Sequence, residues 1–191
     1  MAYGIATLLA YLIGSISSAI IVSKLLHLPD PRKEGSGNPG ATNVLRLGGK
    51  KAAIATLLGD ALKGIIPVLL AKAYGLDSTG VSLVILATFL GHLYPIYFRF
   101  QGGKGVATAF GCFLALSWPL GLSLLATWIL IAACFRYSSL AALMTALFAP
   151  FYTWYFAGVH YVAIICIVSL LLIYRHKKNI LKLVKGEEQK I

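Results

Sequence analysis

The sequence predicts an all-α integral membrane protein, and three observations support this prediction. Hydrophobic residues make up 59% of the 191-residue chain and charged residues only 12%, which is too apolar a balance for a soluble globular domain. The apolar residues occur in long unbroken runs, whereas the strands of a membrane barrel would alternate apolar and polar residues. Most of these runs approach the roughly 20 residues that a helix needs to cross a bilayer.

Five apolar runs are clear, and a sixth is longer. The five cover residues 4–26, 52–74, 81–98, 138–156 and 160–174. The first run lacks a basic stretch before it and a small-residue cleavage site after it, so we expect a mature span and no signal peptide. The sixth run, residues 105–135, is too long for one straight span and too short for two full ones.

The distribution of Lys and Arg indicates how residues 105–135 fold, because cytoplasmic loops carry an excess of these residues. If the run turns at residues 117–119 and crosses twice, the basic C-terminal tail lies on the same side as the earlier basic loops. All of the 17 basic residues except Lys63 and Lys72 are then cytoplasmic. The sequence therefore predicts seven transmembrane helices in a single domain over residues 1–191, with the N-terminus outside and the C-terminus in the cytoplasm.

Three short segments at the predicted cytoplasmic face contain most of the unusual residues. They are GSGNPGATN at 35–43, QGGKG at 101–105 and YRHKKN at 174–179. Each is glycine-rich or basic and none contains an acidic residue, which suits the binding of anionic groups. The net charge of +11 also has a simpler source, because lysines such as those of the C-terminal tail orient the chain and attract anionic lipid heads.

The first segment is predicted to begin a helix. Asn38 is the expected N-cap, and Pro39 is the expected first helical residue, where its missing N–H costs nothing. The N–H groups that follow, including those of Gly40 and Thr42, would then face an anion at the positive end of the helix dipole.

Side chains of the same segment suit a phosphate. Gly35 and Gly37 permit close approach of the backbone, and Ser36 offers a hydroxyl between them. Thr42 or Asn43 would share a helix face with Arg46, which could bind a phosphate through two parallel hydrogen bonds. The alternative is a flexible glycine turn before a capped helix.

The second segment places Gly102, Gly103 and Gly105 around Lys104, where two predicted helices meet. Lys104 would lie at a helix N-terminus and could hold a phosphate or an oxyanion. The segment is not a Walker A loop, which needs a glycine and a Ser or Thr at positions occupied here by Phe98 and Gly105. An interfacial turn with a snorkelling lysine is the alternative.

Ionisable residues inside predicted spans are functional candidates. His92 lies near the inner end of its span, where it is either functional or merely hydrogen-bonded to a neighbour. Asp60 and Lys63, three residues apart on one helix, are expected to pair with each other. Ser139 follows a short inner turn, where it either caps a helix or contacts a ligand.

The third segment follows the last predicted span. A basic stop at the membrane exit is common, but that role requires neither His176 nor Asn179, which lie at helical spacing on one face. Both are therefore functional candidates. The three cysteines are widely spaced within apolar runs and are expected to be small hydrophobic residues, with no disulfide and no metal site.

In order and spacing, these segments resemble the three cytoplasmic motifs of the bacterial acyl-phosphate:glycerol-3-phosphate acyltransferase family, PlsY. The matching strings are GSIS at 14–17, RKEGSGNPGATNVLR at 32–46, GHLYP at 91–95, GGKGVAT at 102–108 and RHKKNILKLVKGEE at 175–188. The resemblance covers nearly the whole chain, and GSGNPGATN together with GGKGVAT is its most specific part. Ser17, Gln101 and Lys182 stand where the family usually has Pro, Lys and Arg.

The resemblance implies transfer of a fatty acyl group from acyl phosphate to the 1-hydroxyl of glycerol-3-phosphate. Lysophosphatidic acid and phosphate would be the products, in the committed step of bacterial phospholipid synthesis. The expected partners are acyl phosphate, glycerol-3-phosphate and membrane lipids, with no nucleic acid, cofactor or metal. The implied location is the bacterial cytoplasmic membrane, with the active site facing the cytoplasm.

Roles follow for the candidate residues. We assign the donor phosphate and the tetrahedral oxyanion to Ser36, Asn43 and Arg46, together with Lys104 and its glycines. The resemblance implies that His176 and Asn179, with Ser139, bind or orient glycerol-3-phosphate. The general base is left open: His92, His176 or a substrate phosphate could accept the hydroxyl proton. The expected catalytic residues are Ser36, Arg46, His92, Lys104, His176 and Asn179. The expected substrate-binding residues are Gly35, Gly37, Asn38, Gly40, Thr42, Asn43, Gly102, Gly103, Gly105 and Ser139.

Other membrane proteins fit the residues less well. A CDP-alcohol phosphotransferase needs several aspartates to hold metal ions, but the three aspartates here lie in separate segments. An acyltransferase of the His–Asp type needs these two residues separated by four others, and no pair satisfies this spacing. A small anion transporter is the remaining alternative, although it would need polar or broken helices through the midplane.

Overall fold

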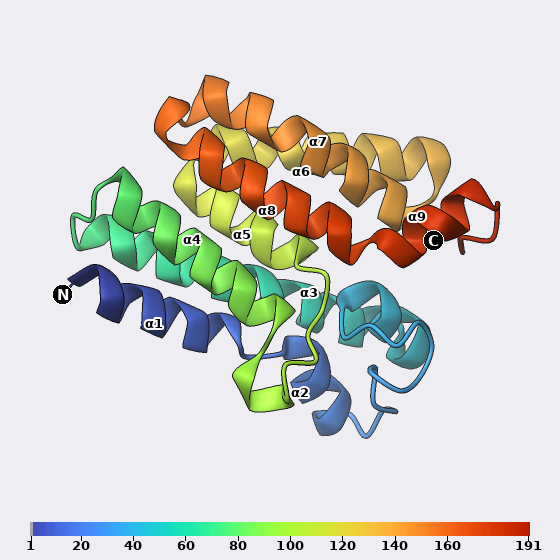
Figure 1. Cartoon of the computed structure of the whole chain (residues 1–191). Coiled ribbons are helices and arrows are strands. Elements are labelled where there is room, and N and C mark those ends of the chain that lie inside the picture. The colour runs from blue at the N-terminus through green and yellow to red at the C-terminus, as the bar shows by residue number, and fades with distance from the viewer. Residues whose placement is uncertain (1) are drawn as a thin grey trace. The chain divides into compact units, whose positions relative to one another are not determined.

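A computed structural model describes residues 2–191, and all regular elements in that range are helices (Figure 1). Within it, five helices are long and apolar enough to cross a membrane, or six when the bent pair at residues 159–184 counts as one span. The predicted class, an all-helical membrane protein, is confirmed. The chain forms two compact units, one ending at Ala115 and the other covering Leu116–Ile191, and each is described by itself.

The first predicted span is a broken helix. Helices α1 (Ala2–Gly14) and α2 (Ser18–Leu25) are separated at residues 15–17, where Ser17 has an extended backbone with φ −92° and ψ 100°. The break therefore forms without a proline. It exposes main-chain groups that a continuous helix would have paired.

Helix α3 (Ala41–Ala73) contains the second predicted span and a segment before it. Gly49 has φ 76° and ψ −173°, so residues 41–48 and 50–73 form two helical parts joined by a kink. The second part corresponds to the predicted run 52–74. Lys72, near its end, donates a hydrogen bond of 3.0 Å to the carbonyl of Ala115.

Helix α4 (Ser78–Leu93) corresponds to the third predicted span. Asp77 caps it by accepting a hydrogen bond of 2.9 Å from the N–H of Gly80, and this bond lowers the pKa of Asp77. The short helix η1 (Ile96–Phe98) and then α5 (Val106–Leu116) follow.

Glycines allow the helices of the first unit to approach closely. A Cβ atom added at Gly14 of α1 would collide with the carbonyl of Thr88 on α4. One added at Gly64 of α3 would likewise collide with the carbonyl of Thr108 on α5. Small residues at such contacts are typical of helices that pack within a membrane.

The second unit begins at the predicted turn. Helix α5 ends at Leu116, Ser117 is extended with φ −152° and ψ 120°, and α6 (Trp118–Phe135) begins with Pro119 in its first turn. The predicted break at residues 117–119 is confirmed, and proline at a helix start explains it.

Helices α7 (Ser138–Phe156) and α8 (Val162–Arg175) complete the apolar part of this unit, with η2 (Val159–Tyr161) between them. Helices α6 and α7 pack together, as do α7 and α8 (Figure 1). Helix α9 (Lys177–Val184) follows α8 after a bend of 58°.

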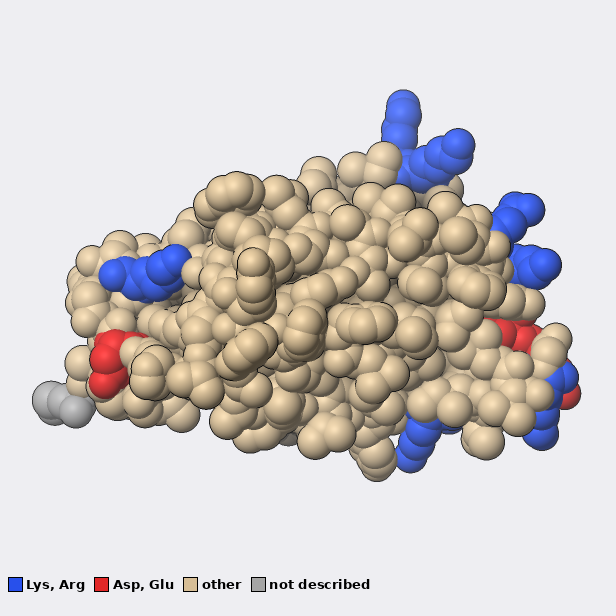
Figure 2. Space-filling view, turned by 90° about the horizontal axis from the view of Figure 1, so that it is seen from above, with Lys and Arg blue, Asp and Glu red and all other residues tan. Residues whose placement is uncertain are grey.

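On the face shown in Figure 2, uncharged residues dominate, and Lys and Arg side chains protrude from it. Large apolar side chains are exposed on both units, among them Leu8, Leu57, Leu130 and Phe151. In water such a surface would be unfavourable, so its composition fits contact with lipid.

Candidate functional site

The loop before α3 folds around the side chain of Asn43. This side chain is 1% exposed, and its Oδ1 accepts a hydrogen bond of 2.9 Å from the N–H of Ser36. Its Nδ2 donates to the carbonyls of Pro31 at 2.9 Å and Glu34 at 3.0 Å. Both protons of the amide are thus donated to carbonyl groups of the loop backbone. The buried side chain of Asn43 therefore stabilises the conformation of the first segment.

Two glycines let the loop take this path. Gly35 and Gly37 have φ values of 65° and 70°, in the left-handed region that favours glycine. A Cβ atom at Gly35 would also collide with Oδ1 of Asn43. Ser36 lies exposed between them, and Arg46 is exposed on the helix that follows.

The predicted start of this helix at Asn38 is wrong by two residues. The N-cap is Gly40, with φ −151° and ψ 163°, and α3 begins at Ala41. The N–H of Gly40 donates to the carbonyl of Asn38 at 2.9 Å, which closes a γ-turn centred on Pro39. The fixed φ of Pro39 is used in this turn and not in the helix.

A charged pair stabilises the start of the loop. Arg32 donates to the carboxylate of Asp30 through its Nε at 3.0 Å and its terminal nitrogen at 2.6 Å. These bonds hold the pKa of Asp30 below its ordinary value, against the opposing effect of partial burial. The guanidinium of Arg32 is therefore engaged, while Arg46 extends from the adjacent helix.

The second segment runs back along α4 before α5 begins (Figure 1). The N–H of Gly103 donates to the carbonyl of His92 at 3.2 Å, and a Cβ atom at Gly102 would collide with that same carbonyl. A Cβ atom at Gly103 would collide with Nε2 of His92 and lie 2.9 Å from the carbonyl oxygen of Pro39. The structure therefore brings the first segment, the second segment and His92 together at one point.

Lys104 is half-buried and lies two residues before the start of α5. The carbonyl of Gly105, which has φ 88°, accepts a hydrogen bond of 2.8 Å from the N–H of Ala109 and so begins the helical pattern. An ammonium group beside a helix N-terminus can hold a phosphate or a developing oxyanion. This placement agrees with the position expected for Lys104.

His92 is buried and contacts a neighbouring side chain, as one of the two alternatives stated for it from the sequence requires. Its Nδ1 is 3.1 Å from Oγ1 of Thr108, and Oδ1 of Asp60 is 3.9 Å away. The predicted pairing of Asp60 with Lys63 is confirmed by a distance of 2.8 Å between Nζ and Oδ1.

In the second unit, Ser139 and Asn179 share one partner. Oε1 of Glu188 lies 2.6 Å from Oγ of Ser139, at the start of α7, and 2.6 Å from Nδ2 of Asn179, in the first turn of α9. Our site prediction from sequence omitted Glu188. The sequence feature that could have indicated it is the pair Glu187 and Glu188 in a tail that is otherwise basic.

His176 lies buried at the bend between α8 and α9, and its hydrogen bonding defines its tautomer. Its Nδ1 is 2.8 Å from the carbonyl oxygen of Leu172. A carbonyl only accepts, so Nδ1 carries the proton, and Nε2 is the basic nitrogen of the neutral ring.

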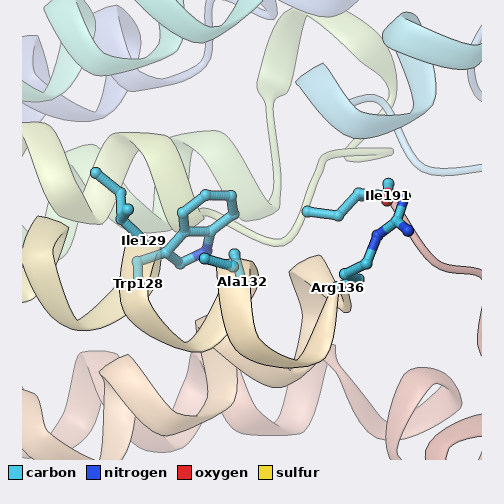
Figure 3. A pocket seen from close by; sticks show the side chains of 6 residues that line it. Trp128, Ile129, Ala132, Arg136 and Ile191 are labelled. Atoms are coloured by element: carbon cyan, nitrogen blue, oxygen red, sulfur yellow. Dashed lines mark hydrogen bonds between the residues drawn. The ribbon is translucent and has the colours of Figure 1, made fainter.

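An open groove of about 430 Å³ lies elsewhere on the second unit (Figure 3). Trp128, Ile129 and Ala132 of α6 line it, together with Ala133, Arg136 and the C-terminal Ile191. The N–H of Ile191 donates to the carbonyl of Arg136 at 2.8 Å, which holds the tail at the end of α6. None of the predicted site residues lines this groove.

The glycine-bounded cationic loops on apolar helices define a membrane-embedded protein that handles anionic groups. A family model described as glycerol-3-phosphate acyltransferase matches residues 4–186. The chain belongs to the glycerol-3-phosphate acyltransferase family.

Relatives and solved structures agree with this membership. A glycerol-3-phosphate acyltransferase of Cupriavidus metallidurans is 61% identical over 188 residues, covering 96% of this chain and 93% of the relative. One of Methylococcus capsulatus is 58% identical over 183 residues, covering 95% and 92%. Crystal structures of PlsY, an integral membrane glycerol 3-phosphate acyltransferase, in its glycerol 3-phosphate and lysophosphatidic acid forms have TM-scores of 0.95 and 0.91. They are 39% and 38% identical to this chain, covering 100% of it and 96% of each structure.

Proposed function

We propose that this chain transfers a fatty acyl group from acyl phosphate to the 1-hydroxyl of glycerol-3-phosphate, giving lysophosphatidic acid and inorganic phosphate. One observation carries the proposal: Lys104 lies just before α5, in a loop that meets both Pro39 of the first segment and His92 of α4. Phosphate-bearing substrates need such a cationic site, and the apolar helices around it suit an acyl chain. Family membership and the two PlsY forms support glycerol-3-phosphate as the acceptor.

The donor site is the part most directly tied to Lys104. Acyl phosphate is an activated anhydride, so the acceptor oxygen can attack the acyl carbon without an enzyme nucleophile. The carbonyl oxygen becomes an oxyanion, which Lys104 would stabilise, and the bond from the acyl carbon to the phosphate oxygen then breaks. Ser36 and Arg46 would bind the donor phosphate through the hydroxyl and guanidinium groups that the loop exposes.

The acceptor site would use the residues gathered in the second unit. Asn179 and Ser139, both fixed by Glu188, would orient glycerol-3-phosphate together with His176. The hydroxyl proton must leave as the new ester bond forms. Nε2 of His176 is suited to accept it, because Nδ1 is already protonated toward Leu172.

We propose the same topology that the sequence predicts: one domain over residues 1–191 with seven spans in the cytoplasmic membrane of a bacterium, the N-terminus outside, and the C-terminus and active site facing the cytoplasm. The break at Ser117 and the basic tail support it. Single cysteines in a cysteine-free background provide the test. Those at Lys33, Gln101 and Lys178, which are exposed, should be labelled only from the cytoplasm, and one at Thr79 only from outside. Labelling of position 178 from outside would refute the topology.

The choice of donor tests the proposed reaction. Purified protein should form lysophosphatidic acid from glycerol-3-phosphate with acyl phosphate, should be inactive with acyl-CoA, and should be unaffected by EDTA. In the described residues, 2–191, no group of three or more His, Cys, Asp or Glu side chains could hold a metal ion. Comparable rates with acyl-CoA, or loss of activity in EDTA that added metal restores, would contradict the proposal.

A further inference from the structure

A buried polar cluster in the first unit surrounds His92, and its other members have no place in the proposed reaction as described so far. It consists of Asp60 and Lys63 on α3, His92 on α4 and Thr108 on α5, all nearly inaccessible to solvent. Polar groups within a membrane bundle are costly unless they satisfy one another. The contacts within the cluster show what each member does.

Lys63 has a structural role. Its Nζ donates to the carbonyl of Ile16 at 2.6 Å, and Ile16 lies in the break between α1 and α2. A helix break leaves carbonyl groups without a helical partner, and the ammonium group satisfies one of them. Asp60, 2.8 Å from Nζ, balances the buried positive charge.

Asp60 also faces His92. The same oxygen, Oδ1, lies 3.9 Å from Nδ1 of His92, which is too far for a hydrogen bond, but the carboxylate acts electrostatically on the polar imidazole ring in a poorly solvated interior. Oγ1 of Thr108 lies 3.1 Å from the same nitrogen. Asp60 and Thr108 therefore constrain one edge of the imidazole ring.

The opposite edge of this ring borders the lysine loop. Nε2 of His92 occupies the space that a Cβ atom at Gly103 would need, and the main chain of the two residues is hydrogen-bonded. A rotation or shift of the imidazole would therefore press directly on Gly103. Lys104 is the next residue, so its position depends on the ring.

We propose that Asp60 is a positioning residue for acyl transfer: paired with Lys63, it fixes the imidazole of His92, and His92 fixes the loop that presents Lys104. The role in turnover rests on the function proposed above, whereas the link from Asp60 to His92 does not. The charge pair thus connects the break in the first span to the loop at the reaction centre.

The test must separate positioning from folding. Asp60→Asn alone leaves Lys63 buried without its counter-charge and is expected to destabilise the protein. The double variant Asp60→Asn/Lys63→Gln removes both charges and retains hydrogen-bonding groups. We expect it to unfold within a few degrees of the wild-type temperature, with kcat at least tenfold lower and KM for both substrates within about threefold of the wild-type values.

Two further variants complete the design. Thr108→Val, which removes the other contact to Nδ1, should also lower kcat. Thr88→Val is the matched control on α4, because its hydroxyl donates to the carbonyl of Val84 on the same helix, and it should leave kcat unchanged. If the stable double variant turns over within twofold of wild type, Asp60 has only a structural role and the proposal is wrong.

A measurement on His92 itself does not require turnover. The ¹⁵N signals of its ring, identified by their loss in His92→Asn, should shift in the double variant and remain in place in Thr88→Val. Unchanged signals in the double variant would overturn the proposal. Absence of acyl transfer in the wild-type protein would instead refute the proposed function, and the ring signals would still decide the role of Asp60.

Discussion

The N–H of Ser36 donates a hydrogen bond of 2.9 Å to the side chain of Asn43, seven residues further along the chain. Through this bond, a buried amide on α3 sets the position of an exposed hydroxyl in the loop. The buried Asn43 therefore stabilises the loop conformation. The exposed residues that could contact substrate are Ser36 and Arg46.

Replacing Asn43 should disrupt the loop more than the fold. Asn43→Ala removes three hydrogen bonds to the loop, and each buried backbone group left unpaired costs about 1–3 kcal/mol unless water reaches it. We expect kcat/KM to fall at least tenfold and the unfolding temperature to fall by several degrees. Gln189→Ala, which truncates an exposed amide, is the control. Wild-type turnover in Asn43→Ala would show that the loop does not need this support.

Gly103→Ala should be strongly defective. Its methyl group would collide with Nε2 of His92 and crowd the carbonyl of Pro39, so the loop, the ring or both must move. We expect at least a tenfold loss of kcat/KM in steady-state assays. Gly4→Ala is the matched control, because no atom lies within 4 Å of its added Cβ, and it should behave as wild type. Equal activity of the two variants would exclude a tightly constrained loop.

The basic residues should fall into two groups. Removal of one preorganised donor to the charge that develops in a transition state typically costs about 100- to 1,000-fold in rate. Lys104→Ala, at the oxyanion, and Arg46→Ala, at the donor phosphate, should therefore nearly abolish turnover in folded protein. Lys104→Arg should also be poor, because a planar guanidinium cannot replace a compact ammonium.

The tail lysines provide the comparison. An exposed lysine contributes only about 1 kcal/mol to membrane association, so Lys182→Ala, Lys185→Ala and Lys190→Ala should keep most activity. Of these, Lys182 is the substitution most expected to affect activity, because it lies within the third motif, in the last turn of α9. Near-normal turnover in folded Lys104→Ala would remove that lysine from the site.

Glu188→Gln tests the acceptor site. The carboxylate of Glu188 holds Ser139 and Asn179 through bonds of 2.6 Å, and a neutral amide accepts hydrogen bonds more weakly. We expect KM for glycerol-3-phosphate to rise several-fold, with a smaller effect on KM for acyl phosphate. Glu187→Gln changes the exposed neighbouring carboxylate and should have no effect. An equal rise in both KM values for Glu188→Gln would contradict a specific role toward the acceptor.

Some local features of the fold could be predicted because a single residue type dictates them. Pro119 favours a helix start, which places the break at Ser117, and a buried lysine three residues after an aspartate has few alternatives to pairing with it. The break in the first span was not predicted, because glycine and serine residues such as those at 14–18 are tolerated within membrane helices, and Lys63, which satisfies Ile16, lies far along the chain.

Features of the site that depend on distant contacts were missed for a similar reason. Asn38 and Pro39 have the composition of a helix start, but a γ-turn uses both, and α3 begins after Gly40. The role of Asn43 as a loop support and the contact of Glu188 with Ser139 require the tertiary structure.

The most direct test of the proposed reaction is phosphate release by the purified wild-type protein supplied with acyl phosphate, with and without glycerol-3-phosphate. Direct transfer predicts that release requires glycerol-3-phosphate and yields one phosphate for each lysophosphatidic acid formed, in the presence of EDTA. Phosphate release at the same rate without glycerol-3-phosphate, or lysophosphatidic acid formation without phosphate release, would contradict transfer from acyl phosphate to this acceptor.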